Sequence, residues 1–201
     1  MQVRASMAST RPELKFGGYD PAKRVDAADL EILTWKNGIL YHTGHKSWIG
    51  IDYKEQADDM LEIQHLEKMN SIGVDRSGVG DAVMEVFPLY LQKIMIPIVS
   101  TQQRKLEMID LVKGLFNNDR LLLDEENDKE LRKQILEQEQ IKTDAGNITY
   151  KHPQGRHDDR FWALAYACYV SAAYINGSPR FTVAVAESDR IDNMSAHRSV
   201  F

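Results

Sequence analysis

Four aspartates stand where their side chains could hold metal ions. Asp20 and Asp75 each end a short apolar run, and Asp158 and Asp159 are adjacent to one another. Carboxylates that converge repel one another unless a cation lies among them, and an all-oxygen ligand set suits Mg²⁺ or Mn²⁺ better than zinc. Two such ions can activate a water and stabilise the attacking and leaving oxygens of a phosphodiester. The pattern therefore predicts two-metal hydrolysis of a phosphodiester.

Each of these aspartates also has an ordinary structural explanation. Asp20 before a proline and Asp75 before a Ser-Gly turn could be turn residues, and Asp158 with Asp159 could cap a helix and fill its first turn. Taken singly, those explanations are the more common ones. The metal hypothesis requires that the elements around the aspartates bring all of them to one place.

Hydrophobic periodicity and turn signals predict those elements. Strands are expected at residues 16–20, 30–35, 39–45, 71–75 and 94–99, with a further hairpin at 141–152. Helices are expected at residues 52–70, from 78–80 to about 90 with a disturbance at Pro88, after a Thr101 cap, at 128–138 and at 158–174. Asn37-Gly38 between two apolar runs is a strong hairpin signal.

This order of elements predicts an α/β fold of the ribonuclease H-like kind, a mixed sheet flanked by helices. Three antiparallel strands come first, and parallel strands joined by helices follow. Sites in open α/β sheets form beyond the carboxyl ends of adjacent strands, so Asp20 and Asp75 should be neighbours. A helix that starts beside them would add Asp158 and Asp159.

Composition limits the class of protein. A chain of 201 residues, 43% hydrophobic and 27% charged, fits one domain with a substantial core. The net charge of −5 argues against a general nucleic-acid coat, so any DNA contact should be local. Cys168 is the only cysteine, which excludes a disulfide framework and favours an intracellular, reducing compartment. Its apolar neighbours predict that the thiol is packed in the core. No run is apolar enough to span a membrane.

The residues around the aspartates resemble a known family. Gly17–Ala22, Val74–Gly80 and His152–Asp159 are similar to three successive nuclease motifs of viral (phage-type) DNA-packaging terminase large subunits. The similarity spans roughly residues 16–174. The last motif, followed by Ala163–Ala167, is the most specific of the three.

The resemblance implies a ribonuclease H-like endonuclease that cuts concatemeric double-stranded viral DNA during packaging. It implies that Asp20, Asp75 and Asp158 or Asp159 bind the metals. Its implied partners are DNA, a terminase ATPase domain, a small terminase subunit and a portal, inside the host cell cytoplasm. The basic residues expected near DNA are Arg76, Lys105, Arg156 and Arg160, and His157 is a further accessory residue.

The expected domain boundaries follow from where the periodic pattern of the chain begins and ends. Residues 1–15 are interpreted as a linker or an expression-derived segment, and residues 16–176 as the nuclease domain. Residues 177–201 are interpreted as a C-terminal extension, partly disordered, with a short strand at 181–186.

Other motifs are interpreted as structural. No Gly-x-x-x-x-Gly-Lys-Ser/Thr loop is present, so ATP hydrolysis by this chain is not expected, although Leu121–Glu125 imitates a Walker B element. His42 and His45 have a metal-like spacing without a third ligand and are assigned to a hairpin surface. The acidic stretch 124–128 is assigned to a solvated loop.

Two alternatives remain open from the sequence. Another ribonuclease H-like enzyme, such as a junction resolvase or an integrase, would share the carboxylates but cut a different substrate. A non-catalytic interaction module of a packaging motor would show no metal-dependent cleavage.

Overall fold

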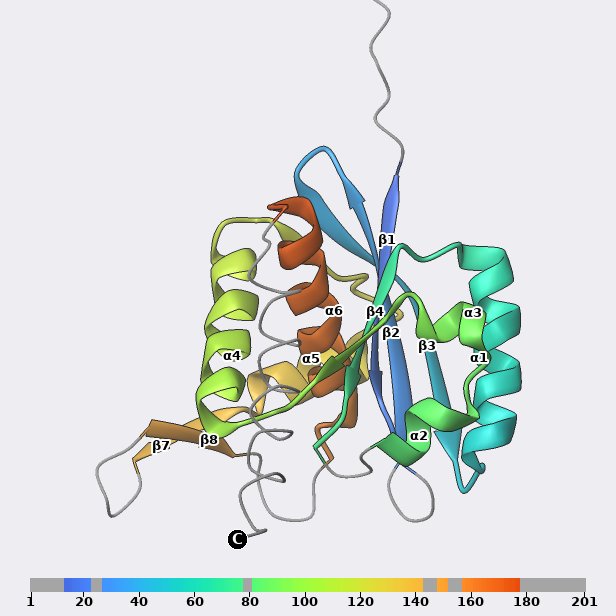
Figure 1. Cartoon of the computed structure of the whole chain (residues 1–201). Coiled ribbons are helices and arrows are strands. Elements are labelled where there is room, and N and C mark those ends of the chain that lie inside the picture. Colours follow the sequence, from blue (N-terminus) through green and yellow to red (C-terminus); the bar gives the residue numbers. More distant parts are fainter. Residues whose placement is uncertain (1–12, 23–26, 78–80, 143–147, 152–156, 178–201) are drawn as a thin grey trace, which may run out of the picture.

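A six-stranded mixed sheet forms the centre of the computed structural model (Figure 1). The structure describes residues 13–22, 27–77, 81–142, 148–151 and 157–177. The strand order is β5-β4-β1-β2-β3-β6, and β7 and β8 form a separate hairpin. The strands are β1 (Leu14–Asp20), β2 (Ala27–Lys36), β3 (Ile39–Ile49), β4 (Ser71–Asp75), β5 (Met95–Ile98), β6 (Leu121–Leu122), β7 (Glu139–Lys142) and β8 (Ile148–Lys151).

The first three strands form an antiparallel meander around a two-residue turn. Asn37 and Gly38 both have positive φ, at 54° and 87°, which is what a tight hairpin turn of the favoured hand requires. β1, β4 and β5 then pair in parallel, and Pro97 lies on the edge strand β5 as its missing N–H demands. The expected mixture of antiparallel and parallel pairing is confirmed.

The helices cover both faces of the sheet. They are α1 (Tyr53–Glu67), α2 (Asp81–Val86), α3 (Leu89–Gln92), α4 (Gln102–Asn117), α5 (Lys129–Leu136) and α6 (Asp159–Ile175). Helices α1 to α3 lie on one face and α4 to α6 on the other (Figure 1). Two apolar cores result, one around Tyr19, Leu30 and Met60 and the other around Phe16 and Met108.

Local signals place the helix ends. The Asp52 carboxylate caps α1 by accepting from the backbone N–H groups of Lys54 (2.9 Å) and Glu55 (3.0 Å). The Thr101 hydroxyl accepts from the Arg104 N–H at 3.2 Å and caps α4. Pro88 falls between α2 and α3, so the expected disturbance is a complete break into two short helices.

One element differs from the sequence expectations, and two segments lie outside the described residues. Leu121–Leu122 form β6, a sixth strand that pairs in parallel with β3, rather than an element that merely imitates a nucleotide-binding strand. The tails at residues 1–12 and 178–201, including the expected strand at 181–186, lie outside the described residues. The proposed domain boundaries therefore stay predictions.

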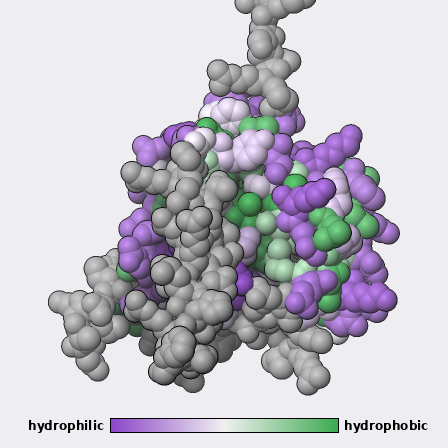
Figure 2. All heavy atoms as spheres, viewed as in Figure 1, coloured by the Kyte–Doolittle hydropathy of each residue, from purple (hydrophilic) through white to green (hydrophobic). Residues whose placement is uncertain are grey.

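The chain buries most of its apolar side chains between the sheet and the helices that cover its two faces. Cys168 is fully buried, and burial raises the pKa of its thiol. Figure 2 shows apolar side chains gathered over α2 and α3 on an otherwise largely hydrophilic face, where Val86, Leu89 and Tyr90 are exposed. Over the part of the chain that the structure describes, no helix is long and apolar enough to cross a bilayer.

Candidate active site

Asp20 and Asp75 lie at the same edge of the sheet. The parallel register pairs Tyr19 with Val74, so the next residue on each strand is an aspartate, and both are partly exposed. The two strands run in the same direction, which brings their carboxyl ends together. The sequence expectation that these two aspartates are neighbours agrees with the register.

Helix α6 packs against β1 and β4 at close range because both strands carry a glycine. A Cβ built on Gly18 would lie 1.8 Å from the Ala163 carbonyl oxygen, and one on Gly73 would lie 2.8 Å from the Tyr166 carbonyl oxygen. Any side chain on Gly18 would push the helix backbone away. The helix runs back along β1, since Phe16, near the other end of the strand, contacts Tyr174 near the end of the helix. The start of α6 therefore lies at the Asp20 end of the sheet.

The electrostatics of Asp20 show how close the acidic groups are. Burial and then repulsion from Asp75, Asp159 and Asp158, in that order, raise the pKa of Asp20 well above its ordinary value, while Lys105 opposes the shift. Asp75, Asp158 and Asp159 are therefore near enough to Asp20 to act on its charge.

The Asp75 carboxylate is oriented by neighbouring hydrogen-bond donors. Oδ1 of Asp75 accepts from the Ser77 N–H at 2.9 Å and from the Ser100 hydroxyl at 3.0 Å. The Ser100 hydroxyl also lies 3.0 Å from the Tyr166 hydroxyl, which is buried beside the site. These bonds fix the rotation of the Asp75 carboxylate.

Asp158 and Asp159 have contacts of their own. Oδ2 of Asp158 accepts from the indole N–H of Trp162 at 2.9 Å and from the Gln138 amide at 3.3 Å. Nδ1 of His157 lies 3.7 Å from Oδ2 of Asp159, so the expected accessory histidine does lie beside the acids.

The donor set at this edge fits a hard divalent cation. The side-chain atoms of the aspartates that could bind an ion are all carboxylate oxygens, the ligand type that Mg²⁺ and Mn²⁺ prefer. A cation would also relieve the repulsion that raises the pKa of Asp20. Within the described ranges, however, no group of three His, Cys, Asp or Glu side chains is close enough to enclose an ion. The acids share one edge without forming a closed ligand cage.

The basic residues expected near DNA occupy different positions. The Lys105 ammonium lies 4.4 Å from the ring centroid of Trp162, at the acidic edge, and Arg76 directly follows Asp75. The Arg160 guanidinium instead points into the protein and is ion-paired with Glu31. Arg156 lies outside the described residues.

A buried ionic cluster beside the start of α6 was not expected from the sequence. His42 lies between Glu31 and Asp128 with only 5% of its side chain exposed, so the assignment of His42 to a hairpin surface is wrong. Asp128 is buried as well, so the acidic stretch is not wholly a solvated loop. One signal was available: Glu31 lies between Leu30 and Ile32 in the largely apolar run of the predicted strand.

An apolar hollow of about 520 Å³ lies elsewhere, between α4, β6 and α5. Its lining is mainly aliphatic and aromatic and includes none of the four aspartates. The aspartates lie instead at the carboxyl ends of β1 and β4 and at the start of α6.

Comparisons with known proteins agree with this geometry. The family described as the terminase RNaseH-like domain matches residues 17–169. A probable terminase ATPase subunit of Haemophilus phage HP1 is 24% identical over 172 residues, which is 82% of this chain and 28% of that protein. The chain therefore spans little more than a quarter of this relative.

Solved structures show the same fold. The large terminase nuclease of thermophilic phage G20c superposes with a TM-score of 0.67 at 22% identity, covering 79% of this chain and 83% of that one. The same nuclease with bound magnesium gives a TM-score of 0.67 at 23% identity, covering 80% and 83%. The HK97 bacteriophage large terminase gives 0.62 at 15% identity, covering 79% of this chain and 40% of that one. The chain belongs to the terminase RNaseH-like domain family.

Proposed function

We propose that this chain is a metal-dependent endonuclease that cuts concatemeric double-stranded viral DNA during genome packaging. The observation that carries the proposal is the proximity of four aspartates at one edge of the sheet, where burial and then repulsion from the other three raise the pKa of Asp20. Carboxylates that lie near one another repel, and a bound cation offsets that repulsion. The arrangement therefore favours a metal centre over a set of turn residues.

The aspartates would share the work of holding two divalent ions. Asp20, Asp75, Asp158 and Asp159 would supply the ligands, and the bound Mg²⁺ or Mn²⁺ would supply charge that activates a water and stabilises the leaving oxygen. Ser77 and Ser100 hold Oδ1 of Asp75, which fixes the plane of that carboxylate before any ligand binds. In support, the G20c nuclease was also solved with bound magnesium, cobalt and zinc.

The DNA would be held mainly through its phosphates. Lys105 and Arg76 stand beside the acidic edge, and His157 lies next to Asp159. Arg156 is proposed as a further contact from its place in the last motif. Contacts of this kind position a duplex without reading its sequence. With a net charge of −5, the chain would bind DNA only locally and with strong salt dependence.

The packaging context of the relatives supports the proposed partners. HP1's matching protein is named a probable terminase ATPase subunit, and this chain matches 28% of it. We therefore propose that the nuclease works with a terminase ATPase domain, a small terminase subunit and a portal in the host cell cytoplasm.

The test is a cleavage assay on three matched substrates. Linear duplex, a four-way junction and an RNA-DNA hybrid are incubated with the chain in Mg²⁺, in Mn²⁺ and in chelator. The proposal expects cutting of linear duplex with little sequence preference in either metal and none in chelator. Preference for the junction or the hybrid would favour another ribonuclease H-like activity. No cutting in Mn²⁺ at any protein concentration would favour a non-catalytic module.

A further inference from the structure

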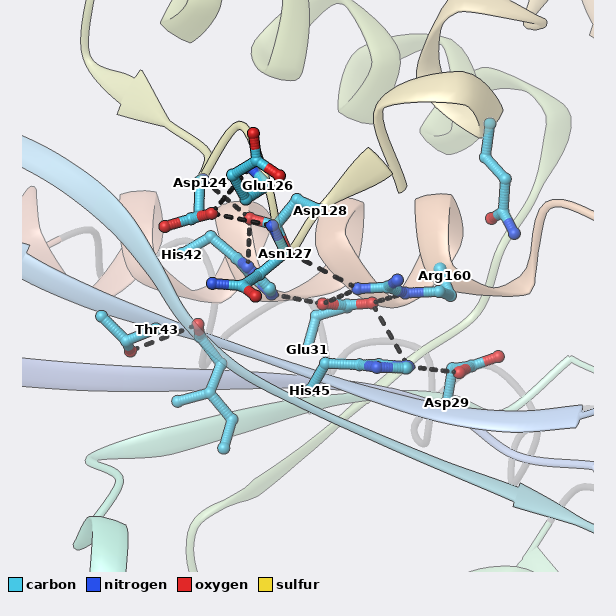
Figure 3. Close-up of polar contacts among 12 residues, drawn as sticks. Asp29, Glu31, His42, Thr43, His45, Asp124, Glu126, Asn127, Asp128 and Arg160 are labelled. Carbon is cyan, nitrogen blue, oxygen red and sulfur yellow. Dashed lines mark hydrogen bonds and ion pairs between the residues drawn. The ribbon is translucent and has the colours of Figure 1, made fainter. Parts of the chain in front are cut away.

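The buried cluster beside α6 links four separate elements through charged side chains (Figure 3). We call Glu31, His42, Asp128 and Arg160 the Arg160 network. Nε of Arg160 donates to Oε1 of Glu31 at 2.6 Å, and Nη2 lies 3.3 Å from Oε2. His42 contacts Glu31 through Nε2 and Asp128 through Nδ1, the latter at 2.8 Å. The network joins β2, β3, the start of α5 and the first turn of α6.

All four side chains are largely removed from water. The exposed fraction is 0% for Glu31, 3% for Asp128, 5% for His42 and 11% for Arg160. Desolvation makes a buried ion network a poor source of net stability, because the attraction between the charges does little more than offset its cost. Buried ionic groups are better attested as devices that select one arrangement of the chain. Such a role requires a segment whose orientation has to be set.

The group that Arg160 can fix is the first turn of α6. Arg160 directly follows Asp158 and Asp159, so any rotation of that turn moves both acids. The contact of Gly18 with the Ala163 carbonyl sets the distance between helix and strand one turn further on, and the Phe161 N–H donates to Oε1 of Gln134 at 3.1 Å. A planar guanidinium that meets both oxygens of one carboxylate does restrict orientation.

The carboxylate that receives Arg160 is itself held in place. Glu31 lies on the central strand β2, which is hydrogen-bonded on both sides by β1 and β3. His42 contacts the same Oε2 that Nη2 of Arg160 approaches, and Asp128 accepts from the Asp124 N–H at 2.8 Å as well as meeting His42. The anchor is therefore part of the rigid sheet rather than a mobile surface group.

We infer that the Arg160 network is a positioning device that fixes the rotation of the first α6 turn and so aims Asp158 and Asp159 at the metal site. The inference rests on the proposed function, in which those two acids hold metal. Glu31 is the central positioning residue, although it lies in a different strand from every proposed ligand. Arg160, expected from the sequence to contact DNA, acts here through Glu31 instead.

The test compares Glu31→Gln with a matched substitution far from the site. Gln64→Leu changes another buried polar side chain, one whose amide bonds to the Met69 N–H and carbonyl, both at 3.0 Å, at the opposite end of β4 from Asp75. Binding of Mn²⁺ alone, without DNA, is measured by calorimetry well below the melting temperature of each protein. Groups that orient metal ligands typically contribute about 10- to 100-fold in affinity, so Glu31→Gln should weaken Mn²⁺ binding by about that factor and Gln64→Leu should not.

A second readout needs no metal. The backbone N–H of Trp162 bonds to the Asp158 carbonyl at 3.0 Å and reports on the first turn of α6. In chelator, amide exchange of Trp162 should be faster in Glu31→Gln than in the wild type, and unchanged in Gln64→Leu. Arg160→Lys, which keeps the charge but loses the planar fork, should behave like Glu31→Gln.

The two readouts separate failure of this inference from failure of the proposed function. Wild-type Mn²⁺ affinity and wild-type Trp162 exchange in Glu31→Gln would overturn the positioning role. Equal weakening of Mn²⁺ binding in Glu31→Gln and Gln64→Leu would do the same, because it would show a general loss of structure. A wild-type chain that binds no Mn²⁺ would instead overturn the metal centre, and with it the purpose of the positioning.

Discussion

The molecule contains two acidic clusters on either side of the start of α6, and their carboxylates are in opposite situations. Around Asp20 the neighbours are chiefly other aspartates, and the pKa of Asp20 is raised. Around Glu31 the neighbours are Arg160 and two histidines. In the second cluster the opposite charges are in direct contact, with Nε of Arg160 2.6 Å from Oε1 of Glu31. In the first, burial and then repulsion from three aspartates raise the pKa of Asp20, and Lys105 opposes the shift. Carboxylate clustering therefore does not by itself mark a metal site, because the balance of neighbouring charges differs between the two clusters.

The largest expected effect comes from neutralising an aspartate of the cluster around Asp20. Asp75→Asn should lower Mn²⁺-dependent cleavage at least about 100-fold, because a direct ligand should matter no less than the groups that orient one. Melting in chelator should stay level or rise, since a repelling charge beside Asp20 is gone. Asp59→Asn is the matched control: Asp59 accepts from Trp48 at 2.8 Å and pairs with Lys46, so this change should lower stability and leave cleavage intact. Vigorous cleavage by folded Asp75→Asn protein would contradict the metal assignment.

In the cluster around Glu31, neutralising one charge is expected to lower stability. Arg160→Met leaves Glu31 buried without its guanidinium and should cost about 3 to 5 kcal/mol in the free energy of unfolding, measured by urea titration. Arg132→Met removes only an exposed contact with Glu125 at 4.0 Å and should cost less than about 1 kcal/mol. The double variant Glu31→Leu with Arg160→Met should lose less than the sum of its singles. A small loss for Arg160→Met would show that Glu31 does not need its partner.

A third, smaller effect concerns pH. The raised pKa of Asp20 means that the folded protein binds its proton more tightly than the unfolded chain, so stability is lost as pH rises from the ordinary value of 3.8 through the raised one. Asp20→Asn should remove this loss in chelator, and saturating Mn²⁺ should weaken it in the wild type. The difference in melting temperature between wild type and variant, followed from acid to neutral pH, isolates Asp20 from other groups. A difference that does not change with pH would mean that the Asp20 carboxyl is not crowded by Asp75, Asp158 and Asp159.

Much of the fold could be predicted because its signals are local. Asn37-Gly38 specifies a hairpin, Asp52 and Thr101 cap helices, and Pro88 breaks one. The proximity of Asp20 and Asp75 could be predicted because each follows the apolar run of one of two parallel strands. These inferences need only neighbours in sequence and the rules of strand pairing. The role of the aspartates as metal ligands remains a prediction.

The buried network could not be predicted in the same way. Glu31 and Arg160 are 129 residues apart, and their contact depends on how α6 rotates over the sheet, which no local pattern encodes. A basic residue after two aspartates looks like a surface group that contacts DNA. His42 in a hairpin likewise looks exposed until α5 and α6 cover that face. Side-chain direction near a helix start is a tertiary property.

The smallest expected effect tests whether the positive charge of Lys105, beside the aspartates, is used for DNA binding. Lys105 and Lys113 lie on the same helix, and each ammonium lies 4.4 Å from the centroid of an aromatic ring, Trp162 and Tyr150 respectively. Only Lys105 is near enough to the aspartates to lower the pKa of Asp20. If Lys105 contacts a phosphate, Lys105→Gln should reduce the slope of log affinity against log salt by about 1 for duplex DNA, equally for unrelated sequences. Lys113→Gln removes a comparable ammonium, one that donates to the Tyr150 hydroxyl at 2.7 Å, and should leave the slope unchanged. Binding is measured by fluorescence anisotropy over a salt series in Ca²⁺, an oxygen-seeking ion used in place of Mg²⁺ to limit cutting. Equal slopes for the two variants would place the DNA path away from the start of α4.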